Sequence, residues 1–227
     1  MIIITGVSGG IGREIVGYLL EIDHVIGFYN KSLPAIPPKN GLVYEQVSIE
    51  EPTNIRNFID KWESRLSKVT LIHCAASKID GLAANYSVSD WDHVIRVNLR
   101  GNFLLTQALL PHMIRERWGR IIHISSVGGM RGAPGTIAYS TSKAGLIGMS
   151  RVLGKEYARF NITSNVIALG TFETGMFLEL PDDQKEMILN QIPSRTFGKV
   201  SNIANAVDFL IKSEYVNASV ITIDGGM

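Results

Sequence analysis

The feature that most constrains this sequence is a series of short apolar runs that alternate with longer stretches of helical periodicity. The runs cover residues 2–4, 24–28, 42–47, 69–72, 121–124, 162–168 and 219–223. They lack the alternation of polar and apolar residues that a half-exposed strand shows, which indicates strands buried on both faces. The sequence therefore predicts an α/β fold, with a Rossmann-type, doubly wound parallel sheet of about seven strands and helices on both faces.

Helical periodicity is clearest in four of the intervening segments. Ile11, Ile15 and Leu19 are spaced by four residues and predict a first helix. Residues 91–114 form a long amphipathic stretch that Ser89 and Asp90, both favourable capping residues, are expected to open. Residues 138–160 and 203–211 predict two further helices.

The interval between the second and third strands breaks this pattern. Residues 30–41 contain Pro34, Pro37 and Pro38, and this density of proline is incompatible with a helix interior. The sequence therefore predicts an irregular crossover loop there, without a helix. As a loop, it should also be among the least protected parts of the fold.

Composition limits the classes of function. The 227 residues suit one domain spanning 1–227, and 22 basic against 21 acidic residues leave a net charge of +1. We therefore expect neither nucleic acid nor a membrane as partner. Cys74 is the single cysteine, which excludes an intrachain disulfide and favours a reducing, cytoplasmic compartment. No apolar run approaches a membrane span, and the first residues do not resemble a leader peptide, so we expect none.

A glycine-rich turn follows the first strand and opens the first helix. Its candidate cofactor-binding residues are Thr5, Gly6, Ser8, Gly10, Ile11 and Gly12. Gly6 permits a tight turn, Gly10 a close backbone approach to a pyrophosphate, and Gly12 close packing of helix on strand. The helix start offers free N–H groups and a positive dipole end to an anion. The alternative is a tight strand–helix turn without a ligand, but its position favours dinucleotide binding.

A second constellation points to acid–base chemistry. Ser126 ends the fifth strand, and Tyr139 and Lys143 follow with a spacing of four that places both on one helix face. We expect the Lys143 ammonium to lower the pKa of Tyr139, so that Tyr139 acts as a general acid toward a carbonyl oxygen. Ser126 would hydrogen-bond the same oxygen. Taken alone, Tyr-x-x-x-Lys is more typical of an ordinary helix with a surface lysine, but Ser126 at the preceding strand end and the glycine-rich turn favour the catalytic interpretation.

The order of these motifs resembles the short-chain dehydrogenase/reductase family. The Gly-x-x-x-Gly-x-Gly spacing, the Ser126, Tyr139 and Lys143 set, and residues 97–101, 165–174 and 221–227 all carry the likeness. Within the family, residues 115–122, 191–193 and 203–210 are most similar to 3-oxoacyl-acyl-carrier-protein reductases. The resemblance implies that Asn98 is a fourth catalytic residue, which in the family holds a water in the proton path.

The resemblance also implies a nicotinamide cofactor and its contacts. Besides the glycine turn, Tyr139 and Lys143, the expected cofactor-binding residues are Tyr29, Asn30, Lys31, Gln46, Val47, Cys74, Ala75, Ala76, Leu169, Gly170, Phe172 and Thr174. NAD-dependent members carry a carboxylate at the end of the second strand. Tyr29 and Asn30 stand there, and Lys31 can pair with a 2′-phosphate, which favours NADP(H), with NAD(H) as the alternative. The alternative interpretation, in which Lys31 is merely a solvated loop residue, also stays open.

Several residues depart from the family pattern. His73, Cys74, Ala75 and Ala76 replace Asn-Asn-Ala-Gly, Leu169 replaces a proline, and Gln46 replaces an acidic residue near the adenine. The Gln46 amide can still hydrogen-bond the base. Without further Cys or His at metal-ligand spacing, His73 and Cys74 are interpreted as packing residues, and no metal site is expected. His93, His112 and His123 are predicted to be structural or surface residues.

These features predict an NAD(P)H-dependent oxidoreductase that interconverts a carbonyl and a secondary alcohol, most similar to a 3-oxoacyl-(acyl-carrier-protein) reductase. The alternatives are a dehydrogenase of another alcohol, sugar or ketone, or a non-catalytic nucleotide-binding regulator. Presence of all four catalytic residues favours the enzyme. The expected partners are a small carbonyl or acyl-thioester substrate and acyl carrier protein. Arg115, Arg117 and Arg120 are either a docking surface for this acidic carrier protein or a solvated helix end.

The family likeness also implies a homo-oligomer, a tetramer or a dimer. The helices that carry the Asn98 and Tyr139 motifs pair across subunits in the family. Both are expected to present apolar surface for this purpose, from Phe103, Leu104, Leu146, Met149 and Leu153. Residues 171–191, which would cover the substrate pocket, are the least constrained part of the sequence.

Overall fold

Seven parallel strands form one sheet in this computed structural model, which describes residues 1–227 except for the side chains of Met176 and Glu179. The strands are β1 (Ile2–Thr5), β2 (Val25–Tyr29), β3 (Leu42–Gln46), β4 (Thr70–His73), β5 (Gly119–Ser126), β6 (Ile162–Leu169) and β7 (Val220–Ile223). Their order in the sheet is β3-β2-β1-β4-β5-β6-β7, and every pair is parallel. This confirms the predicted doubly wound sheet, whose order reverses between β1 and β4.

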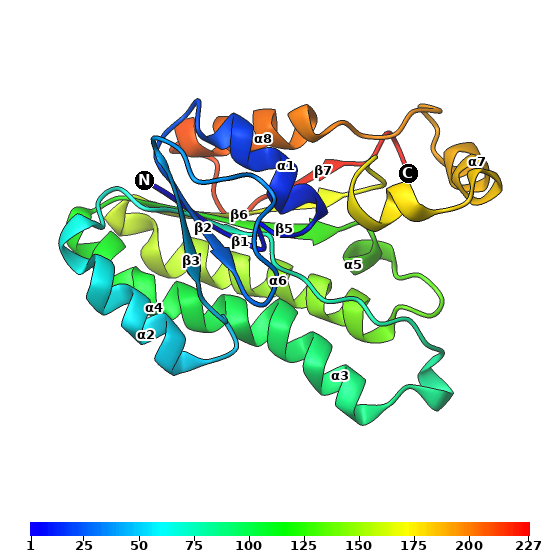
Figure 1. The fold of residues 1–227 in the computed structure, drawn as a ribbon, viewed down its shortest axis with the longest axis horizontal. Coiled ribbons are helices and arrows are strands. Elements are labelled where there is room, and N and C mark those ends of the chain that lie inside the picture. Colours follow the sequence, from blue (N-terminus) through cyan, green and yellow to red (C-terminus); the bar gives the residue numbers. More distant parts are fainter.

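Helices cover both faces of the sheet (Figure 1). One layer contains α1 (Gly10–Leu19) and α8 (Val200–Lys212); the other contains α2 (Pro52–Trp62), α3 (Val88–Ile95), α4 (Gly101–Glu116) and α6 (Ile137–Tyr157). The short α5 (Gly128–Arg131) follows β5, and α7 (Asp182–Gln191) lies near the carboxyl ends of the strands. Single turns of 3₁₀-helix cover Glu63–Arg65, Ala83–Asn85, Ala158–Phe160 and Gly175–Glu179.

Two apolar clusters, one on each side of the sheet, explain why the strands are continuously hydrophobic. Ile2, Ile4 and Ile72 face α1 and α8, whereas Ile3 and Leu71 belong to the cluster beneath α2 and α4. Each strand thus contributes alternate side chains to both layers. Burial on both faces is the physical reason that these runs lack in–out alternation.

The crossover from β2 to β3 is a loop, as its prolines predicted. Residues 30–41 contain bends and a turn but no helix. An isolated antiparallel bridge between Lys39 and Leu42 is the only regular pairing within them. This connection therefore differs from the other crossovers of the sheet, each of which contains a helix.

The predicted helix over 91–114 is longer and less regular than its pattern indicated. It begins at Val88, with Ser87 at the N-cap and no side-chain cap, so the expectation that Ser89 and Asp90 open it was wrong. Between α3 and α4, Arg96–Arg100 form a turn of π-helix. The wider turn changes which face each following residue presents, an effect that the sequence period alone does not reveal.

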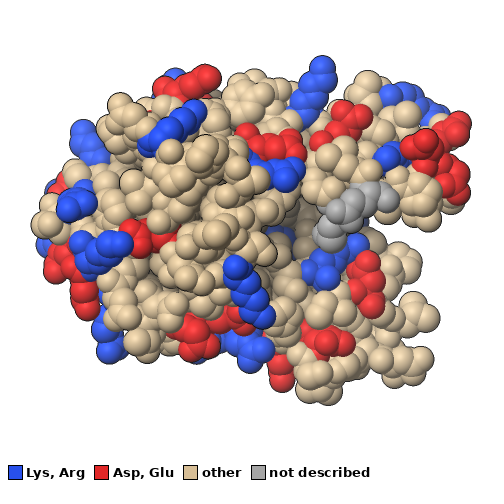
Figure 2. Space-filling model, in the orientation of Figure 1, with Lys and Arg blue, Asp and Glu red and all other residues tan. Residues whose placement is uncertain are grey.

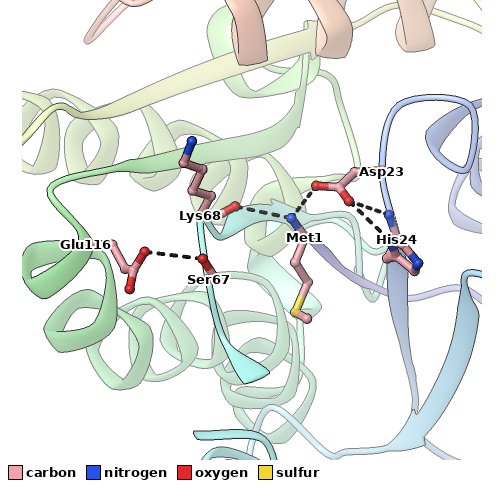
Figure 3. Close-up of polar contacts among 6 residues, drawn as sticks. All are labelled: Met1, Asp23, His24, Ser67, Lys68 and Glu116. Carbon is pink, nitrogen blue, oxygen red and sulfur yellow. Dashed lines mark hydrogen bonds and ion pairs between the residues drawn. The ribbon is translucent and has the colours of Figure 1, made fainter. Parts of the chain in front are cut away.

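The amino edge of the sheet is held by a small polar group (Figure 3). The Met1 ammonium binds the Asp23 carboxylate and lies 3.3 Å from the carbonyl oxygen of Lys68, while Ser67 Oγ donates to Glu116 at 3.2 Å. These contacts tie the starts of β1, β2 and β4 together. They lie at the opposite edge from the carboxyl ends of the strands.

Arg120, near the start of β5, is buried and does not belong to a solvated or docking surface. It is only 1% exposed, and its guanidinium donates to the carbonyl oxygens of Ile211 and Asn161 at 3.1 and 3.0 Å. Ile211 lies in the last turn of α8, whose free carbonyls attract a cation. Of the three arginines considered for docking, Arg120 is therefore excluded, whereas Arg115 and Arg117 are exposed.

Among the described residues, no helix has both the length and the apolar character needed to span a membrane.

Candidate active site

A cavity of about 740 Å³ opens at the carboxyl ends of β1, β4, β5 and β6. Figure 2 shows the surface hollowed between the part that carries α7 and the part that carries α5, and Figure 1 gives the underlying elements. In an open parallel sheet this crevice, beside the reversal of strand order, is where ligands bind.

The structure brings together nearly all the residues predicted from the sequence. The cavity is lined by Thr5, Gly6, Ser8, Gly10, Ile11, Gly12, Tyr29, Asn30, Lys31, Val47, Cys74, Ala75, Ala76, Ser126, Tyr139, Lys143, Leu169, Gly170, Phe172 and Thr174. Segments up to 170 residues apart in the sequence thus converge on one site. Two predicted residues, Gln46 and Asn98, do not line it.

The glycine-rich turn is packed so closely that side chains would not fit. Gly6 has φ +79°, and a Cβ there would lie 2.7 Å from the Cα of Ala75. A Cβ on Gly12 would lie 2.3 Å from the carbonyl oxygen of Gly6, so helix α1 packs directly on the turn. The N-cap residue Gly9 has no side-chain cap, which leaves the first N–H groups of α1 available for an anion.

Gly10 makes a contact that the sequence did not predict. A Cβ there would lie 2.7 Å from the Cα of Gly175, so the turn touches the segment after β6. Beside this contact, Thr174 Oγ1 donates to the Glu14 carboxylate at 2.6 Å. The glycine turn and the segment after β6 therefore meet across the cavity. The expectation that residues 171–191 cover the pocket also includes Met176 and Glu179, which lie outside the described residues.

Ser126, Tyr139 and Lys143 lie on two adjoining elements. Ser126 is the last residue of β5, and its Oγ accepts a hydrogen bond from the Gly128 amide at 3.1 Å. Tyr139 and Lys143 lie one turn apart near the start of α6. Ser125 Oγ donates to the carbonyl oxygen of Lys143 at 2.9 Å, which fastens the helix to the strand.

Tyr139 does not have the lowered pKa expected from its neighbour. Burial raises the pKa of the Tyr139 hydroxyl, a hydrogen bond with Ser126 opposes this, and Cys74 and Asp80 add to the rise. The Lys143 ammonium lies 5.6 Å from the centroid of the Tyr139 ring and donates instead to the carbonyl oxygen of Ile124 at 2.7 Å. Desolvation of the phenolate is thus the largest effect on the pKa of Tyr139.

Lys143 is only 2% exposed, which excludes an ordinary surface lysine. Burial lowers its pKa from 10.5 to about 8, because the charged form loses its hydration. A lysine that is buried at a cavity with a perturbed pKa is typical of a functional site.

Asn98 lies beneath the site rather than in it. Its amide accepts from the Ser77 backbone N–H at 2.7 Å, donates to the Ser77 carbonyl oxygen at 2.8 Å and donates to Ser142 Oγ at 3.0 Å. Asn98 falls within the π-helical turn and is completely buried. It therefore holds the segment after β4 against α6.

Gln46 is turned away from the cavity. Its side-chain amide donates to the carbonyl oxygen of Asn30 at 2.9 Å, and the residue is exposed at the end of β3. This hydrogen bond ties the end of β3 to the crossover loop, and Gln46 is not among the residues that line the cavity. The next residue, Val47, lines the cavity instead.

Sequence reasoning missed part of the lining. The unpredicted residues are Gly9, Phe28, Ser32, Ile49, Glu50, Ser77, His93, Val97, Ile124, Ser125 and Gly175. Most adjoin predicted positions, so wider windows at each strand end would have included them. His93, interpreted as structural or surface, faces the cavity from α3, while His112 and His123 are buried.

His73 and Cys74 are packed between elements. His73 is 1% exposed, with Nε2 2.8 Å from Thr106 Oγ1, and Cys74 lines the cavity. Burial raises the pKa of the Cys74 thiol to about 11, so it is an unreactive thiol at neutral pH. Among the described residues, no three His, Cys, Asp or Glu side chains gather as metal ligands would.

Comparison with known proteins agrees with this geometry. A model of the short chain dehydrogenase family matches residues 1–185. The chain belongs to the short-chain dehydrogenase family. It is therefore an oxidoreductase of the kind that uses a nicotinamide cofactor, and the close-packed glycine turn and uncapped helix start suit the phosphates of such a molecule.

Several curated members of the family are similar to this chain over nearly its whole length. The 3-oxoacyl-(acyl-carrier-protein) reductase of Rickettsia conorii is 37% identical, covering 99% of this chain and 95% of the relative. Nodulation protein G of a Rhizobium species is 38% identical with the same coverage. The 3-oxoacyl-(acyl-carrier-protein) reductase of Thermotoga maritima is 39% identical over 80% of this chain and 75% of the relative.

Proposed function

We propose that this protein reduces 3-oxoacyl thioesters to 3-hydroxyacyl thioesters with NADPH. The observation that carries the proposal is the convergence of Ser126, Tyr139 and Lys143 on the cavity that also contains the glycine turn. The names of its relatives in Rickettsia and Thermotoga support the substrate class. Reduction of a ketone needs a hydride at the carbon and a proton at the oxygen.

When bound, the nicotinamide supplies the hydride. Tyr139 donates the proton to the carbonyl oxygen through its hydroxyl, which burial keeps protonated. Ser126 donates a hydrogen bond to the same oxygen and stabilises the charge that develops on it. The resulting phenolate lies 5.6 Å, measured at its ring centroid, from the buried Lys143 ammonium, whose positive charge favours the ionised form.

Asn98 contributes indirectly in this proposal. Its side chain is occupied by Ser77 and Ser142, so it acts by fixing the backbone beside α6 rather than by touching the substrate.

The cofactor preference is proposed to be NADP(H). Tyr29, Asn30, Lys31 and Ser32 line the cavity after β2 and include no carboxylate to repel a 2′-phosphate. Glu50 also lines the cavity, but its carboxylate is paired with Arg96 at 3.0 Å. Lys31 is exposed and able to reach a bound phosphate.

The proposed setting is a single domain spanning 1–227 in the cytoplasm, with acyl carrier protein delivering the thioester. A tetramer or dimer built on α4 and α6 is part of the proposal. Phe103 and Val152 are 48% and 53% exposed on these helices. Leu146 and Leu153, which the sequence suggested for this surface, are buried within the protomer, while Leu104 and Met149 pack partly against its core. A monomer mass by light scattering at micromolar concentration would contradict the assembly.

The function is tested by following nicotinamide absorbance with a panel of carbonyl compounds. The panel contains 3-oxoacyl thioesters of N-acetylcysteamine and of acyl carrier protein, simple ketones, and oxidised sugars, each with NADPH and NADH. We expect the highest kcat/KM for the acyl thioesters with NADPH. Faster turnover of a ketone or sugar would reassign the substrate, and no binding or oxidation of either cofactor would refute the enzyme.

A further inference from the structure

A stacked pair of histidines lies under the site and has no part in the chemistry described above. His73 and His123 are register partners on β4 and β5, and their rings are 5.0 Å apart and within 12° of parallel. They are 1% and 0% exposed. Two buried imidazoles cost hydration free energy that apolar residues would not, so their presence calls for a physical account.

The pair belongs to a chain of polar contacts across the sheet, in which the two stacked rings link hydrogen bonds on either side of them. His73 Nε2 lies 2.8 Å from Thr106 Oγ1 on α4, and His123 Nε2 lies 3.3 Å from Ser164 Oγ on β6. Ser164 Oγ in turn donates to Ser150 Oγ on α6 at 3.1 Å. The chain therefore runs from α4 through three strands and returns to α6, with every member buried.

The same strand and helix also hold Lys143. Ile124 accepts a hydrogen bond from the Lys143 ammonium, and Ser125 donates to the Lys143 carbonyl oxygen. His123 directly precedes these two residues on β5 and shares the face of Ser125. Ser150 lies seven residues after Lys143, two turns along the same face of α6. The helix is thus fastened to the sheet at two levels, to β5 at Lys143 and to β6 at Ser150.

The hydrogen bonds also determine the tautomer of the His123 ring. Ser164 has one hydroxyl proton and gives it to Ser150, so its oxygen accepts from His123 Nε2–H. Nδ1 is then the unprotonated nitrogen, and it has no hydrogen-bond partner. Burial lowers the pKa of His123 to about 3 and that of His73 as well, and the positive charge of Lys143 adds to both effects. Both rings are therefore neutral.

Among the residues whose side chains the structure describes, the charged and titratable groups that act on the pair and on Lys143 include no carboxylate. Lys143 from α6 acts on both rings, His123 acts on His73, and Cys74, which follows β4, interacts with Lys143. A buried ammonium without a counter-ion depends on the dipoles around it. Neutral imidazoles provide such dipoles, whereas aliphatic side chains would not.

We propose that His123, supported by His73, is a positioning residue for Lys143. Through Ser164 and Ser150 it holds α6 in place on the sheet, and it keeps an uncharged polar ring beside the buried ammonium. The proposal rests on the proposed function in that Lys143 assists proton transfer. His123 does not line the cavity, so it acts on Lys143 and not on the substrate.

The test combines turnover with a direct titration of Lys143. The variants are His123→Leu, which removes the polar ring, His123→Gln, which keeps a donor at similar reach, and Ser150→Ala, which removes the end of the chain. Ile121→Val is the matched control, because Ile121 is buried on the same face of the same strand. The Lys143 pKa is measured by NMR of labelled lysine side chains, with Lys143→Met assigning the signal.

We expect His123→Leu to lower kcat on the order of tenfold to a hundredfold, as small displacements of a catalytic group do, with KM for the thioester nearly unchanged. The pKa of Lys143 should fall further below its usual value. His123→Gln should recover most of the kcat, and Ser150→Ala should reduce it by a smaller factor in the same direction. Ile121→Val should lower the urea midpoint alone.

Two outcomes would overturn the proposal. One is an unchanged Lys143 pKa and kcat in His123→Leu; the other is an equal loss of kcat in Ile121→Val at matched stability. If His123→Leu does not fold, an unchanged Lys143 pKa and kcat in Ser150→Ala would overturn the proposal in its place. The NMR titration needs no substrate, so it decides the positioning role even if the thioesters are not turned over and the proposed function fails.

Discussion

The two halves of the cavity are built in different ways. Around Ser126, Tyr139 and Lys143, the side chains stand on the end of β5 and the start of α6, and hydrogen bonds join the two elements. Around Tyr29 to Ser32, they stand on a loop that begins as β2 ends and carries no helix. In the first half Lys143 is buried and Ser126 and Tyr139 are partly buried, whereas most of the second half is exposed.

The difference reflects what each half has to do. Proton transfer requires groups placed to within a fraction of an ångström, which packed helices and strands supply. Recognition of a phosphate on a ribose tolerates a longer, solvated side chain, because charge attraction depends only weakly on exact geometry. Substitutions should therefore have large effects in the first half and modest ones in the second.

Tyr139→Phe should have the largest effect. Loss of the hydroxyl removes the proton donor, and kcat should fall on the order of 10²–10⁴-fold, while the dissociation constant for NADPH changes little. Cofactor affinity is measured by fluorescence titration and kcat by nicotinamide absorbance. Tyr157→Phe, near the end of the same helix, is the control and should retain wild-type kcat. Near-normal turnover in Tyr139→Phe would remove the proposed mechanism.

The second-largest effect should be a fall of kcat/KM at alkaline pH. Lys143 carries its proton below its pKa of about 8 and loses it above. We therefore expect kcat/KM to be level below that pH and to fall about tenfold per pH unit above it.

The pH dependence of the free energy of unfolding provides the control for this loss of activity. The pKa of Lys143 is lower in the folded chain than in the unfolded one, so loss of its proton favours folding as the pH rises from about 8 toward 10.5. This group's contribution to the free energy of unfolding should increase while activity decreases. A kcat/KM that stays level to pH 10 would show that the Lys143 charge is not needed.

Lys31→Ala tests the loop half. Removing the ammonium should reduce the preference for NADPH over NADH by about tenfold, the usual scale for a charge-assisted hydrogen bond that is partly solvated. The ratio of kcat/KM values for the two cofactors measures it. Lys39→Ala, at the other end of the same loop, should leave the ratio unchanged. A wild-type enzyme that prefers NADH would contradict the assignment outright.

Hydrogen exchange should detect the smallest effect. Amides of residues 31–41 have few partners within regular structure and should exchange quickly without cofactor, then several-fold more slowly with NADPH. Amides of α6 should be protected in both states, which supplies an internal reference. Helix-like protection of residues 31–41 in the free protein would mean that the two halves are equally rigid.

The sequence predicted the strands and the cavity well because both depend on local patterns. Ile2 to Ile4 could only be a strand buried on two faces, and parallel strands bring their carboxyl ends to one edge whatever the loops do. The absence of a helix over 30–41 followed from the prolines alone. These outcomes need no knowledge of how particular side chains pack.

The misplaced residues depend on packing that no local pattern encodes. Asn98 lies in a π-helical turn and bonds Ser77, and Gln46 is drawn to the carbonyl of Asn30. The pKa of Tyr139 is raised chiefly because its hydroxyl is desolvated, and the Lys143 ammonium donates to the carbonyl oxygen of Ile124. Similarly, the internal partners of Arg120 appear only once α8 is placed beside β5.

The missing crossover helix has a consequence for how copies of the protein meet in a crowded solution. β3 is an outermost strand of the sheet, and such an edge offers unpaired amide and carbonyl groups to any other extended chain. The segment leading into it contains Pro34, Pro37 and Pro38, which lack a donor, and Lys39, which folds back to pair with Leu42. The prolines that prevent a crossover helix therefore also discourage strand-to-strand aggregation at the β3 edge.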